Sequence, residues 1–436
     1  MHQYTLNDIA HLLNCEGSFP CDFVNGYFTD SRLTKPGGVF FALKGEREDG
    51  HAFLKEIASK GALGAVVSKE YEGEIEGLYL LKVSDPLHSL QKLARERVNR
   101  LKPRIVGVTG SLGKTTTKGF IATLLARKFL VACNPGNQNS QVGLPLTILD
   151  AMKGNEEILV LEMGMTKSGH LTKLLQIATP EVAVITSVAL VHAENFDSIE
   201  SIGRAKGEIF SHPFTGLGIL NRSIPNYEEL LGIGGCKKHS FSVALPADYT
   251  FEDEHLKEIK KKCRLPGEHN LSNLLAAVAV ARYFGMTWEE INAGASDLLL
   301  PEKRLQIVKH QDKIFVNDSY NAAEQSIKAA LLAMPEPEGR GRKIAVLGSM
   351  RELGKFSASC HASVGKYALD KVDLMYCLGE ECLPIRAVWQ NAGRPVKFFH
   401  HRQELALALK ADLQQSDVIL LKGSRPWELW KLLEEL

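Results

Sequence analysis

A glycine-rich turn followed by a lysine and three threonines is the part of this sequence best suited to chemistry. Ile105–Val108 predicts a short buried strand, Gly110–Gly113 a tight turn, and Lys114 the start of a helix. The backbone N–H groups of such a turn and the positive end of the helix dipole together bind phosphate. The Lys114 ammonium would reach the β- and γ-phosphates of a nucleotide, and the Thr115 hydroxyl would bind Mg²⁺. The stretch therefore predicts a nucleotide-phosphate site, although Val108 stands where the usual pattern has its first glycine.

Further polar groups follow predicted strands and helices of the same segment. Glu162 stands at the end of the predicted strand Ile158–Leu161. P-loop enzymes place the carboxylate that lies near Mg²⁺ at the same position, at the end of a strand. Asn134–Ser140 is a loop rich in amides, His192 follows the next strand, and Lys206 lies on a predicted helix. Each has an ordinary alternative explanation, because acidic residues often end strands, lone histidines are often packed, and helix lysines are usually solvated.

Polar residues also stand at strand ends near the N-terminus. Asp30–Arg32 precedes the predicted buried strand Val39–Leu43, and Lys44 follows that strand. Ligands of α/β proteins bind at the ends of strands, so these groups are compatible with a phosphate-containing ligand. Solvated loop charge is the alternative interpretation.

Short apolar strands alternate with amphipathic helices along the whole chain, which predicts the α/β class. A length of 436 residues corresponds to two to four domains. Pro103, directly before the phosphate-loop strand, marks the first break. We expect a first domain over residues 1–102, a second over 103–310 and a third over 311–436.

Composition narrows the class of protein. The 52 basic and 51 acidic residues give no electrostatic reason to expect nucleic acid or a membrane surface as a partner. The eight cysteines include no CxxC pair and no zinc spacing, so we expect reduced thiols. Met1–Leu13 predicts an amphipathic helix instead of a signal peptide, and no apolar run approaches the ~18 residues that cross a bilayer. We therefore expect a globular protein of the cytoplasm.

Taken together, these groups resemble a known family. The turn TGSxGKT (Thr109–Thr115), Glu162, His192 and the segment GRAKGEIF (Gly203–Phe210) are similar to those of the Mur ligases, the ATP-dependent amide-forming enzymes of peptidoglycan precursor synthesis. The resemblance covers nearly the whole chain, in order. It implies that CO₂ carbamylates Lys206 and that the carbamate and His192 ligate a second Mg²⁺. Only a neutral amine captures CO₂, and a divalent cation stabilises the charge that results.

Later segments extend the resemblance into the nucleotide site. Three residues match an H-N-x-x-N pattern that lies near the adenine and ribose in the family: His269, Asn270 and Asn273. Helix capping by Asn270 is an alternative explanation. Arg304 matches the arginine of a G-R segment, and Asp318–Ala322, DSYNA, matches D-x-Y-N-A. The resemblance implies that Asp318 and Asn321 face the nucleotide and the incoming amine.

Six further residues, at four places, depart from the pattern of the family. Glu302-Lys303 replaces Pro-Gly, Ala323-Glu324 replaces Asn-Pro, Ser349 replaces the aspartate of G-D-M-x-E-L-G, and His170 replaces a glutamate. The resemblance makes no prediction for the side chains at these positions.

The end of the last predicted strand distinguishes members of the family. Lys422–Arg425, KGSR, matches the members that add D-alanyl-D-alanine, and the D-N-P-R motif of the third-residue adder is absent. The resemblance thus implies ATP-dependent joining of D-alanyl-D-alanine to UDP-N-acetylmuramoyl-tripeptide through an acyl phosphate. It implies ATP, two Mg²⁺ ions and a carbamylated lysine as cofactors, and a monomer whose domains close around the substrates.

The implied fold comprises a small N-terminal α/β UDP-binding domain, a central P-loop ATPase-like domain with a parallel sheet, and a C-terminal Rossmann-like α/β domain. The implied catalytic residues are Lys114, His192 and Lys206. The implied ATP-binding residues are Thr109, Gly110, Ser111, Leu112, Gly113, Lys114, Thr115, Thr116, His269, Asn270, Asn273, Arg304 and Asp318. The implied metal ligands are Thr115, Glu162, His192 and Lys206. The implied substrate-binding residues are Ser31, Arg32, Lys44, Asn137, Asn139, Ser140, Asn321 and Lys422.

Three other functions are compatible with parts of the pattern. The third-residue adder or a folylpolyglutamate synthetase would share the phosphate loop and the lysine, and a non-catalytic nucleotide-binding scaffold would need only the loop. Asp30–Arg32 argues against the folate enzyme, which lacks a UDP-binding domain of this kind. The intact set of Lys114, Glu162, His192 and Lys206 argues against the scaffold.

Overall fold

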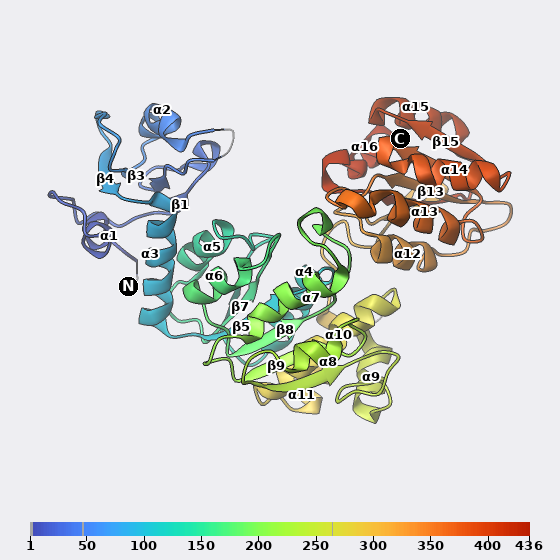
Figure 1. Ribbon diagram of the computed structural model, residues 1–436, viewed down its shortest axis with the longest axis horizontal. Coiled ribbons are helices and arrows are strands. Elements are labelled where there is room, and N and C mark those ends of the chain that lie inside the picture. The colour runs from blue at the N-terminus through green and yellow to red at the C-terminus, as the bar shows by residue number, and fades with distance from the viewer. Residues whose placement is uncertain (1–2, 46–47, 264) are drawn as a thin grey trace.

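The computed structural model describes residues 3–45, 48–263 and 265–436. They form three α/β bodies, each built on its own sheet, and the chain passes from one to the next along an arc (Figure 1). The predicted class is confirmed. The exact domain boundaries stay a prediction, and the third sheet already begins with a strand at Gln306, before the expected boundary at residue 311.

The first body is a four-stranded parallel sheet in the order β1-β2-β3-β4. Asp85 caps the long helix α3 by accepting hydrogen bonds from the backbone N–H groups of Leu87 and His88, and Pro86 opens its first turn. Helix α3 contacts strands of this sheet and also helices α5 and α6 of the second body, so it connects the two (Figure 1). The elements are α1 (Leu6–Leu13), β1 (Tyr27–Phe28), β2 (Val39–Phe41), α2 (Leu54–Ser59), β3 (Gly64–Ser68), β4 (Tyr79–Val83) and α3 (Pro86–Leu101).

The second body has a six-stranded, entirely parallel sheet in the order β10-β9-β8-β5-β7-β6. Most residues of its strands are apolar on both faces of the sheet, because helices cover both faces. The strands are β5 (Arg104–Thr109), β6 (Val131–Cys133), β7 (Ile158–Glu162), β8 (Val182–Ile185), β9 (Leu217–Asn221) and β10 (Lys237–Phe241). The helices are α4 (Lys114–Leu125), α5 (Gly143–Ala151), α6 (His170–Ile177), α7 (Ile199–Gly207), α8 (Tyr227–Leu231), α9 (Glu254–Cys263), α10 (Glu268–Tyr283) and α11 (Trp288–Gly294).

The register of this sheet brings the predicted phosphate loop and Glu162 to one edge. Val108 pairs with Glu162 across β5 and β7, and Thr109 pairs with Ile185 across β5 and β8. The carboxyl ends of β5, β7 and β8 therefore meet at the same edge, which is where open α/β sheets bind ligands.

The third body has a six-stranded sheet in the order β11-β12-β16-β13-β14-β15, in which only the pairing of β11 with β12 is antiparallel. The strands are β11 (Gln306–His310), β12 (Lys313–Asn317), β13 (Lys343–Gly348), β14 (Leu374–Leu378), β15 (Val396–Phe399) and β16 (Val418–Lys422). The helices are α12 (Glu324–Leu332), α13 (Ser357–Ala368), α14 (Leu383–Asn391), α15 (Arg402–Asp412) and α16 (Leu432–Glu435).

All eight cysteines are free thiols in the structure, in agreement with the expectation from their spacing. Within the described ranges, no helix combines the length and the apolar character needed to cross a membrane.

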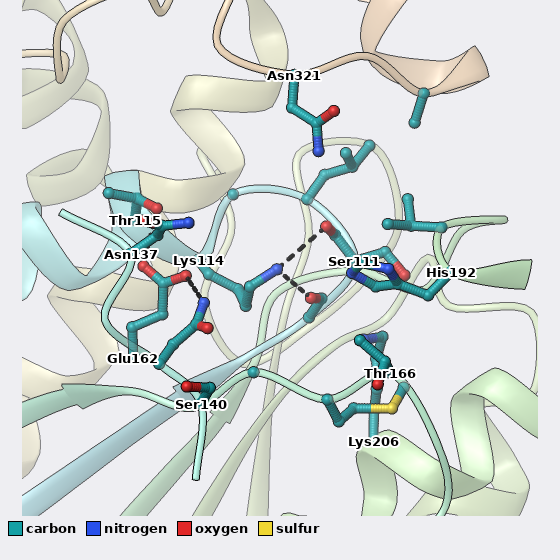
Figure 2. Close-up of a pocket in the computed structure, with 18 of the residues that line it drawn as sticks. Ser111, Lys114, Thr115, Asn137, Ser140, Glu162, Thr166, His192, Lys206 and Asn321 are labelled. Carbon is teal, nitrogen blue, oxygen red and sulfur yellow. Dashed lines mark hydrogen bonds between the residues drawn. The ribbon is translucent and has the colours of Figure 1, made fainter. Parts of the chain in front are cut away.

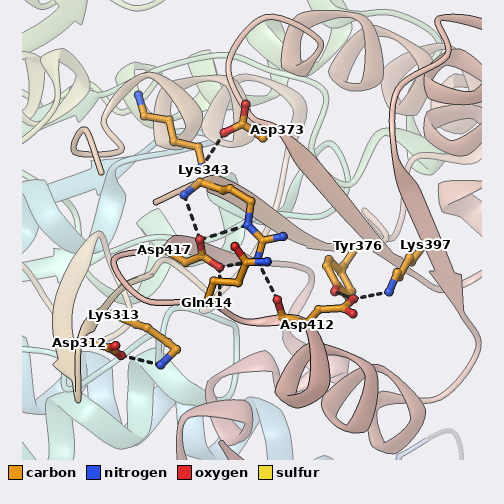
Figure 3. Close-up of polar contacts among 10 residues, drawn as sticks. Asp312, Lys313, Lys343, Asp373, Tyr376, Lys397, Asp412, Gln414 and Asp417 are labelled. Carbon is orange, nitrogen blue, oxygen red and sulfur yellow. Dashed lines mark hydrogen bonds and ion pairs between the residues drawn. The ribbon is translucent and has the colours of Figure 1, made fainter. Parts of the chain in front are cut away.

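A buried ion pair joins two neighbouring strands of the third sheet at their N-terminal ends (Figure 3). Asp417, with 0% of its side chain exposed, accepts hydrogen bonds from the Arg342 guanidinium at 2.6 and 3.2 Å and from the backbone N–H of Gln414 at 2.9 Å. Arg342 also donates to the backbone oxygen of Asp412 at 2.7 Å. The pair therefore fixes the starts of β13 and β16 to each other.

We expect Asp417→Ala to lower the free energy of unfolding of the third domain by about 3 kcal/mol, because it removes the carboxylate that accepts from the Gln414 N–H and leaves the partly buried guanidinium of Arg342 without this counterion. Urea unfolding followed by tryptophan fluorescence measures this, since Trp389, Trp427 and Trp430 lie in this domain. Asp312→Ala is the control: it removes a pair with Lys313 in which the aspartate is 43% exposed, and it should cost less than about 1 kcal/mol. Equal losses for the two variants would contradict the assignment.

Candidate functional site

The phosphate loop forms between β5 and α4, as the sequence predicts. Gly110 and Gly113 have φ angles of 150° and 83°. A Cβ atom on Gly110 would lie 1.9 Å from the Thr186 hydroxyl, and one on Gly113 would lie 2.3 Å from the Asn273 side-chain oxygen. Both positions therefore require glycine for conformation and for space. The loop ends at Lys114, the first residue of α4, so the free backbone N–H groups of this helix face the loop.

The Lys114 ammonium lies over the loop and donates hydrogen bonds to the backbone oxygens of Gly110 at 2.8 Å and Ser111 at 3.3 Å (Figure 2). Burial lowers the pKa of Lys114, Glu162 opposes this shift, and Arg304 adds to it. The cation is therefore held where phosphate oxygens would contact the loop.

Glu162 is the carboxylate of the site and is only 1% exposed. Its two oxygens accept hydrogen bonds from the Thr115 hydroxyl at 2.8 Å and from the Asn139 amide at 2.6 Å. Its backbone N–H donates to the side-chain oxygen of Asn134 at 2.8 Å. The strand end, the first turn of α4 and the amide-rich loop thus converge on one carboxylate.

Lys206 and His192 line the same cavity from other elements. Lys206, in the last turn of α7, is 3% exposed, and none of the described residues accepts a hydrogen bond from its ammonium. Burial moves the pKa of Lys206 well below its usual value, and the nearby Lys114 charge moves it further. Burial also lowers the pKa of His192, against the opposing effect of Glu352, whose carboxylate pairs with its Nδ1 atom. Burial therefore shifts both side chains toward their neutral forms.

The residues present fit Mg²⁺. The described chain holds no cluster of three or more His, Cys, Asp or Glu side chains that could bind a metal by itself. Mg²⁺ does not need one, because it is commonly held by one or two carboxylates together with substrate phosphates. The Thr115 hydroxyl and the Glu162 carboxylate supply the oxygen donors that it prefers. An ammonium cannot be a metal ligand, so a second ion at His192 and Lys206 would require the lysine to carry a carbamate, and this carbamate stays a prediction.

The sequence prediction missed Lys118, one turn beyond Lys114 on α4. It is buried and donates hydrogen bonds to the backbone oxygens of Asn134 and, at 2.9 Å, Gly136. Burial lowers the pKa of this lysine as well. Its i, i+4 spacing from Lys114 was the signal that could have identified it. Lys118 anchors the loop that carries Asn139 to Glu162.

The first cavity, of about 450 Å³, gathers most of the predicted phosphate, metal and substrate residues. Figure 2 shows Lys114 between the group Thr115, Asn137 and Glu162 and the pair His192 and Lys206. The predicted residues that line it are Gly110, Ser111, Leu112, Gly113, Lys114, Thr115, Asn137, Asn139, Ser140, Glu162, His192, Lys206, Arg304 and Asn321.

A second cavity, of about 550 Å³, adjoins the loop on its other side, between the second and third bodies. Asn270 donates to the backbone oxygen of Pro266 at 2.7 Å, while Gly267 is the N-cap of α10 and no described side chain caps this helix, so the capping alternative for Asn270 is wrong. Asn273 accepts from the Thr117 hydroxyl at 3.2 Å. The predicted residues that line this cavity are Leu112, Gly113, Thr116, His269, Asn270, Asn273, Arg304, Asp318 and Lys422. Thr109 lines neither cavity and is buried in β5.

Lys422, at the end of β16, is fully buried, and its ammonium is occupied by the protein. It pairs with the Asp318 carboxylate and donates to the backbone oxygens of Asp318 at 3.3 Å and Asn321 at 3.1 Å. The role of Lys422 in substrate binding stays a prediction. In the structure this lysine fixes the Asp318–Asn321 segment against the end of the sheet.

Arg304 lies on the single connection between the second and third bodies and lines both cavities. Its neighbours Lys303 and Leu305 have φ angles of 59° and 46°, and the Leu305 N–H donates to the Asp318 carboxylate at 3.1 Å. The guanidinium of Arg304 stacks over the Tyr320 ring, 4.4 Å from its centroid. Tyr320 was not among the predicted site residues, although it lies within the DSYNA segment.

The first body carries a separate cavity of about 900 Å³ that Ser31 and Arg32 line. Arg32 is exposed and pairs with Asp30 at 2.6 Å, and the Ser31 hydroxyl donates to Glu56 at 3.1 Å. Lys44, also predicted to bind substrate, is exposed and does not line this cavity.

The departures from the family pattern have structural partners. Glu324 pairs with Lys328 at 2.7 Å and accepts from Ser363 at 2.6 Å, so its carboxylate links α12 to α13. Ser349 accepts hydrogen bonds from the Trp427 indole at its backbone and side-chain oxygens. His170 begins α6 and lines the first cavity.

Comparison with known proteins agrees with this architecture. Residues 108–281 match the Mur ligase middle domain, and residues 303–425 match the domain described as Mur ligase, glutamate ligase domain. The UDP-N-acetylmuramoyl-tripeptide–D-alanyl-D-alanine ligase of Bacillus subtilis is 33% identical, with 100% of this chain and 99% of the relative covered. A crystal structure of MurF from Acinetobacter baumannii is similar with a TM-score of 0.87 and 26% identity, covering 100% of this chain and 98% of that one. The MurF ligase of Thermotoga maritima, solved in complex with ADP, has a TM-score of 0.78 and 29% identity, covering 94% and 96%.

The match to the middle domain spans the residues that carry the loop, Glu162 and Lys206, and the Bacillus relative is similar over the whole chain. The chain belongs to the Mur ligase family.

Proposed function

We propose that this chain is an ATP-dependent ligase that joins D-alanyl-D-alanine to UDP-N-acetylmuramoyl-tripeptide. One observation carries the proposal: the phosphate loop, the pair of Thr115 and Glu162, and the buried Lys206 with His192 line a single cavity. Support comes from the full-length likeness to a relative whose name states this activity, and from the ADP bound by the Thermotoga relative.

The first step would activate the terminal carboxyl group of the peptide. A carboxylate oxygen attacks the γ-phosphorus of ATP, the new C–O–P linkage forms, and the bond to the β-phosphate oxygen breaks to release ADP. Lys114 and the loop N–H groups face the β- and γ-phosphates and stabilise negative charge there. When bound, Mg²⁺ at Thr115 and Glu162, with a second ion at His192 and carbamylated Lys206, would supply further charge neutralisation.

The second step would form the amide bond. The free amine of the dipeptide attacks the acyl carbon and a tetrahedral intermediate forms; the nitrogen loses one proton, the C–O bond to the phosphate breaks, and inorganic phosphate leaves. The edge of the first cavity that belongs to the third body, at Asn321 and Ala322, is the side from which this amine would arrive. Holding the acyl phosphate and the amine together removes much of the entropic barrier.

Three features separate this proposal from its alternatives. The Lys422–Arg425 segment favours the dipeptide adder over the third-residue adder, and the cavity at Ser31 and Arg32 favours a UDP-substrate over a folate. A scaffold would not need Lys206 buried without a partner among the described residues. The cytoplasmic location, the monomeric state, the domain boundaries and the individual residue roles stay predictions.

The proposed reaction predicts that release of phosphate from ATP requires both substrates. With UDP-N-acetylmuramoyl-tripeptide and ATP, we expect rapid phosphate release only when D-alanyl-D-alanine is added. The mass of the product should exceed that of the UDP substrate by the mass of one dipeptide minus one water molecule. A coupled phosphate assay and mass spectrometry measure these outcomes. Turnover with the UDP-dipeptide precursor and a free diamino acid would instead identify the third-residue adder, and tight ATP binding without any turnover would identify a scaffold.

Carbamylation of Lys206 predicts a chemical signature that does not depend on activity. In ¹³C-bicarbonate buffer we expect one carbamate carbon signal in the NMR spectrum of the wild type and none in Lys206→Arg, because a guanidinium does not capture CO₂. The same variant should lose at least ~100-fold in kcat, since the loss of a ligand exceeds the 10–100-fold loss typical of groups that orient ligands. Lys173→Arg, on the exposed side of α6, should keep both signal and activity. A wild type without the signal would refute carbamylation.

Binding of the UDP end in the first body predicts a selective kinetic change. Arg32→Ala should raise the KM for UDP-N-acetylmuramoyl-tripeptide about tenfold, or ~1.4 kcal/mol, through loss of one charge-assisted hydrogen bond to a phosphate. The KM for ATP should not change, because Arg32 lies in a different cavity from the phosphate loop. Lys35→Ala, an exposed cation outside the cavity lining, is the control. A rise in both KM values would argue against the assignment.

A further inference from the structure

The second and third bodies touch directly beside the first cavity. The turn at residues 192–197 of the second body meets the loop at residues 352–355 of the third. The Glu194 N–H donates to the Glu352 backbone oxygen at 3.1 Å, and Glu352 pairs through its carboxylate with Nδ1 of His192. Gly354 approaches so closely that a Cβ atom there would lie 3.0 Å from the Glu194 Cα atom. At the edge of the contact, Lys355 lies 3.8 Å from Asp197.

The backbone on both sides of this contact is strained. His192 has φ 54° and Glu352 has φ 62°, in the left-handed region that L residues other than glycine adopt at a cost. The side chains are 30% and 51% exposed, and exposed ion pairs add little to stability. Backbone strain of this kind clusters at functional positions.

The orientation of His192 suggests what the contact does. Glu352 engages Nδ1, which leaves Nε2 as the nitrogen available to the cavity that Lys114 and Lys206 also line. Histidines that bind metal ions usually hold their other ring nitrogen against a carboxylate or carbonyl group, which fixes the ring and increases its basicity. Here the carboxylate belongs to a different domain from the histidine.

We propose that Glu352 is a positioning residue that orients His192 for the second metal ion from across the domain interface. The proposal rests on the proposed function, in which His192 is a ligand of that ion. Because Glu352 reaches His192 only when the third body contacts the second, metal binding at His192 and closure of the domains are coupled. By linkage the coupling is reciprocal: closure raises the affinity for the metal, and the metal favours closure by the same factor.

The test uses the full chain with ADP and Mn²⁺, whose free concentration is read by electron paramagnetic resonance. His192→Ala defines the part of the binding that depends on the histidine. For that part we expect Glu352→Ala to weaken Mn²⁺ binding 10–100-fold, and Glu352→Gln to recover some of the loss because its oxygen still accepts from the imidazole N–H. In the His192→Ala background, Glu352→Ala should have no further effect.

The matched control is Lys355→Ala, which removes the other ion pair of the same interface and should leave Mn²⁺ affinity within twofold. A second readout is small-angle scattering. Mn²⁺ with ADP should reduce the radius of gyration of the wild type, and should reduce that of Glu352→Ala less.

Wild-type affinity in Glu352→Ala, or an equal loss in Lys355→Ala, would overturn the inference while leaving the proposed function intact. Equal Mn²⁺ binding by the wild type and His192→Ala is a different result: it would remove His192 from the metal site, and with it the two-metal form of the proposed function.

Discussion

Burial of lysine side chains around one carboxylate is the constraint on which the site depends. Lys118 and Lys206 are buried and Lys114 is half-buried, and burial is the largest cause of the lowered pKa of each. Glu162 is the acidic group that lines the first cavity with Lys114 and Lys206. Placing cations in a low-dielectric region is unfavourable unless they are hydrogen-bonded or meet anions. The cavity is therefore built to receive a polyanion, and a nucleotide triphosphate meets this need.

Two buried lysines, Lys118 and Lys422, organise the backbone around them. Lys118 holds the Asn134 and Gly136 carbonyl groups, Asn134 holds the backbone of Glu162, and Asn139 holds its carboxylate. In the third body, Lys422 pairs with the Asp318 carboxylate and donates to the backbone oxygen of Asn321. Each of these lysines uses its donors on protein oxygens, so its contribution is to preorganise groups that face the ligands.

The sequence predicted those parts of the site that local patterns encode. The phosphate loop lies within one strand–turn–helix unit, and Glu162 ends a strand whose apolar run is plain, so both could be located without knowledge of the fold. Contacts between distant segments have no local pattern. The pairing of Glu352 with His192 requires two domains to meet, and the protein partners of Lys422 and Asn139 depend on which strand ends become neighbours. Strand order and the antiparallel start of the third sheet at Gln306 likewise follow from packing between segments instead of from periodicity.

The connection that carries Arg304 has a mechanical consequence. It is the one covalent link between the second and third bodies, and the residues on either side of Arg304 have left-handed backbone conformations. Any rotation of the third body must turn about this short segment, so the hinge and a cavity-lining arginine are the same piece of chain. Because Arg304 lines both the first and the second cavity, rotation about this segment would move one cation relative to both cavities at once. Opening of the bodies would therefore change the charge that faces the first and the second cavity in one motion, so the two cavities are mechanically linked.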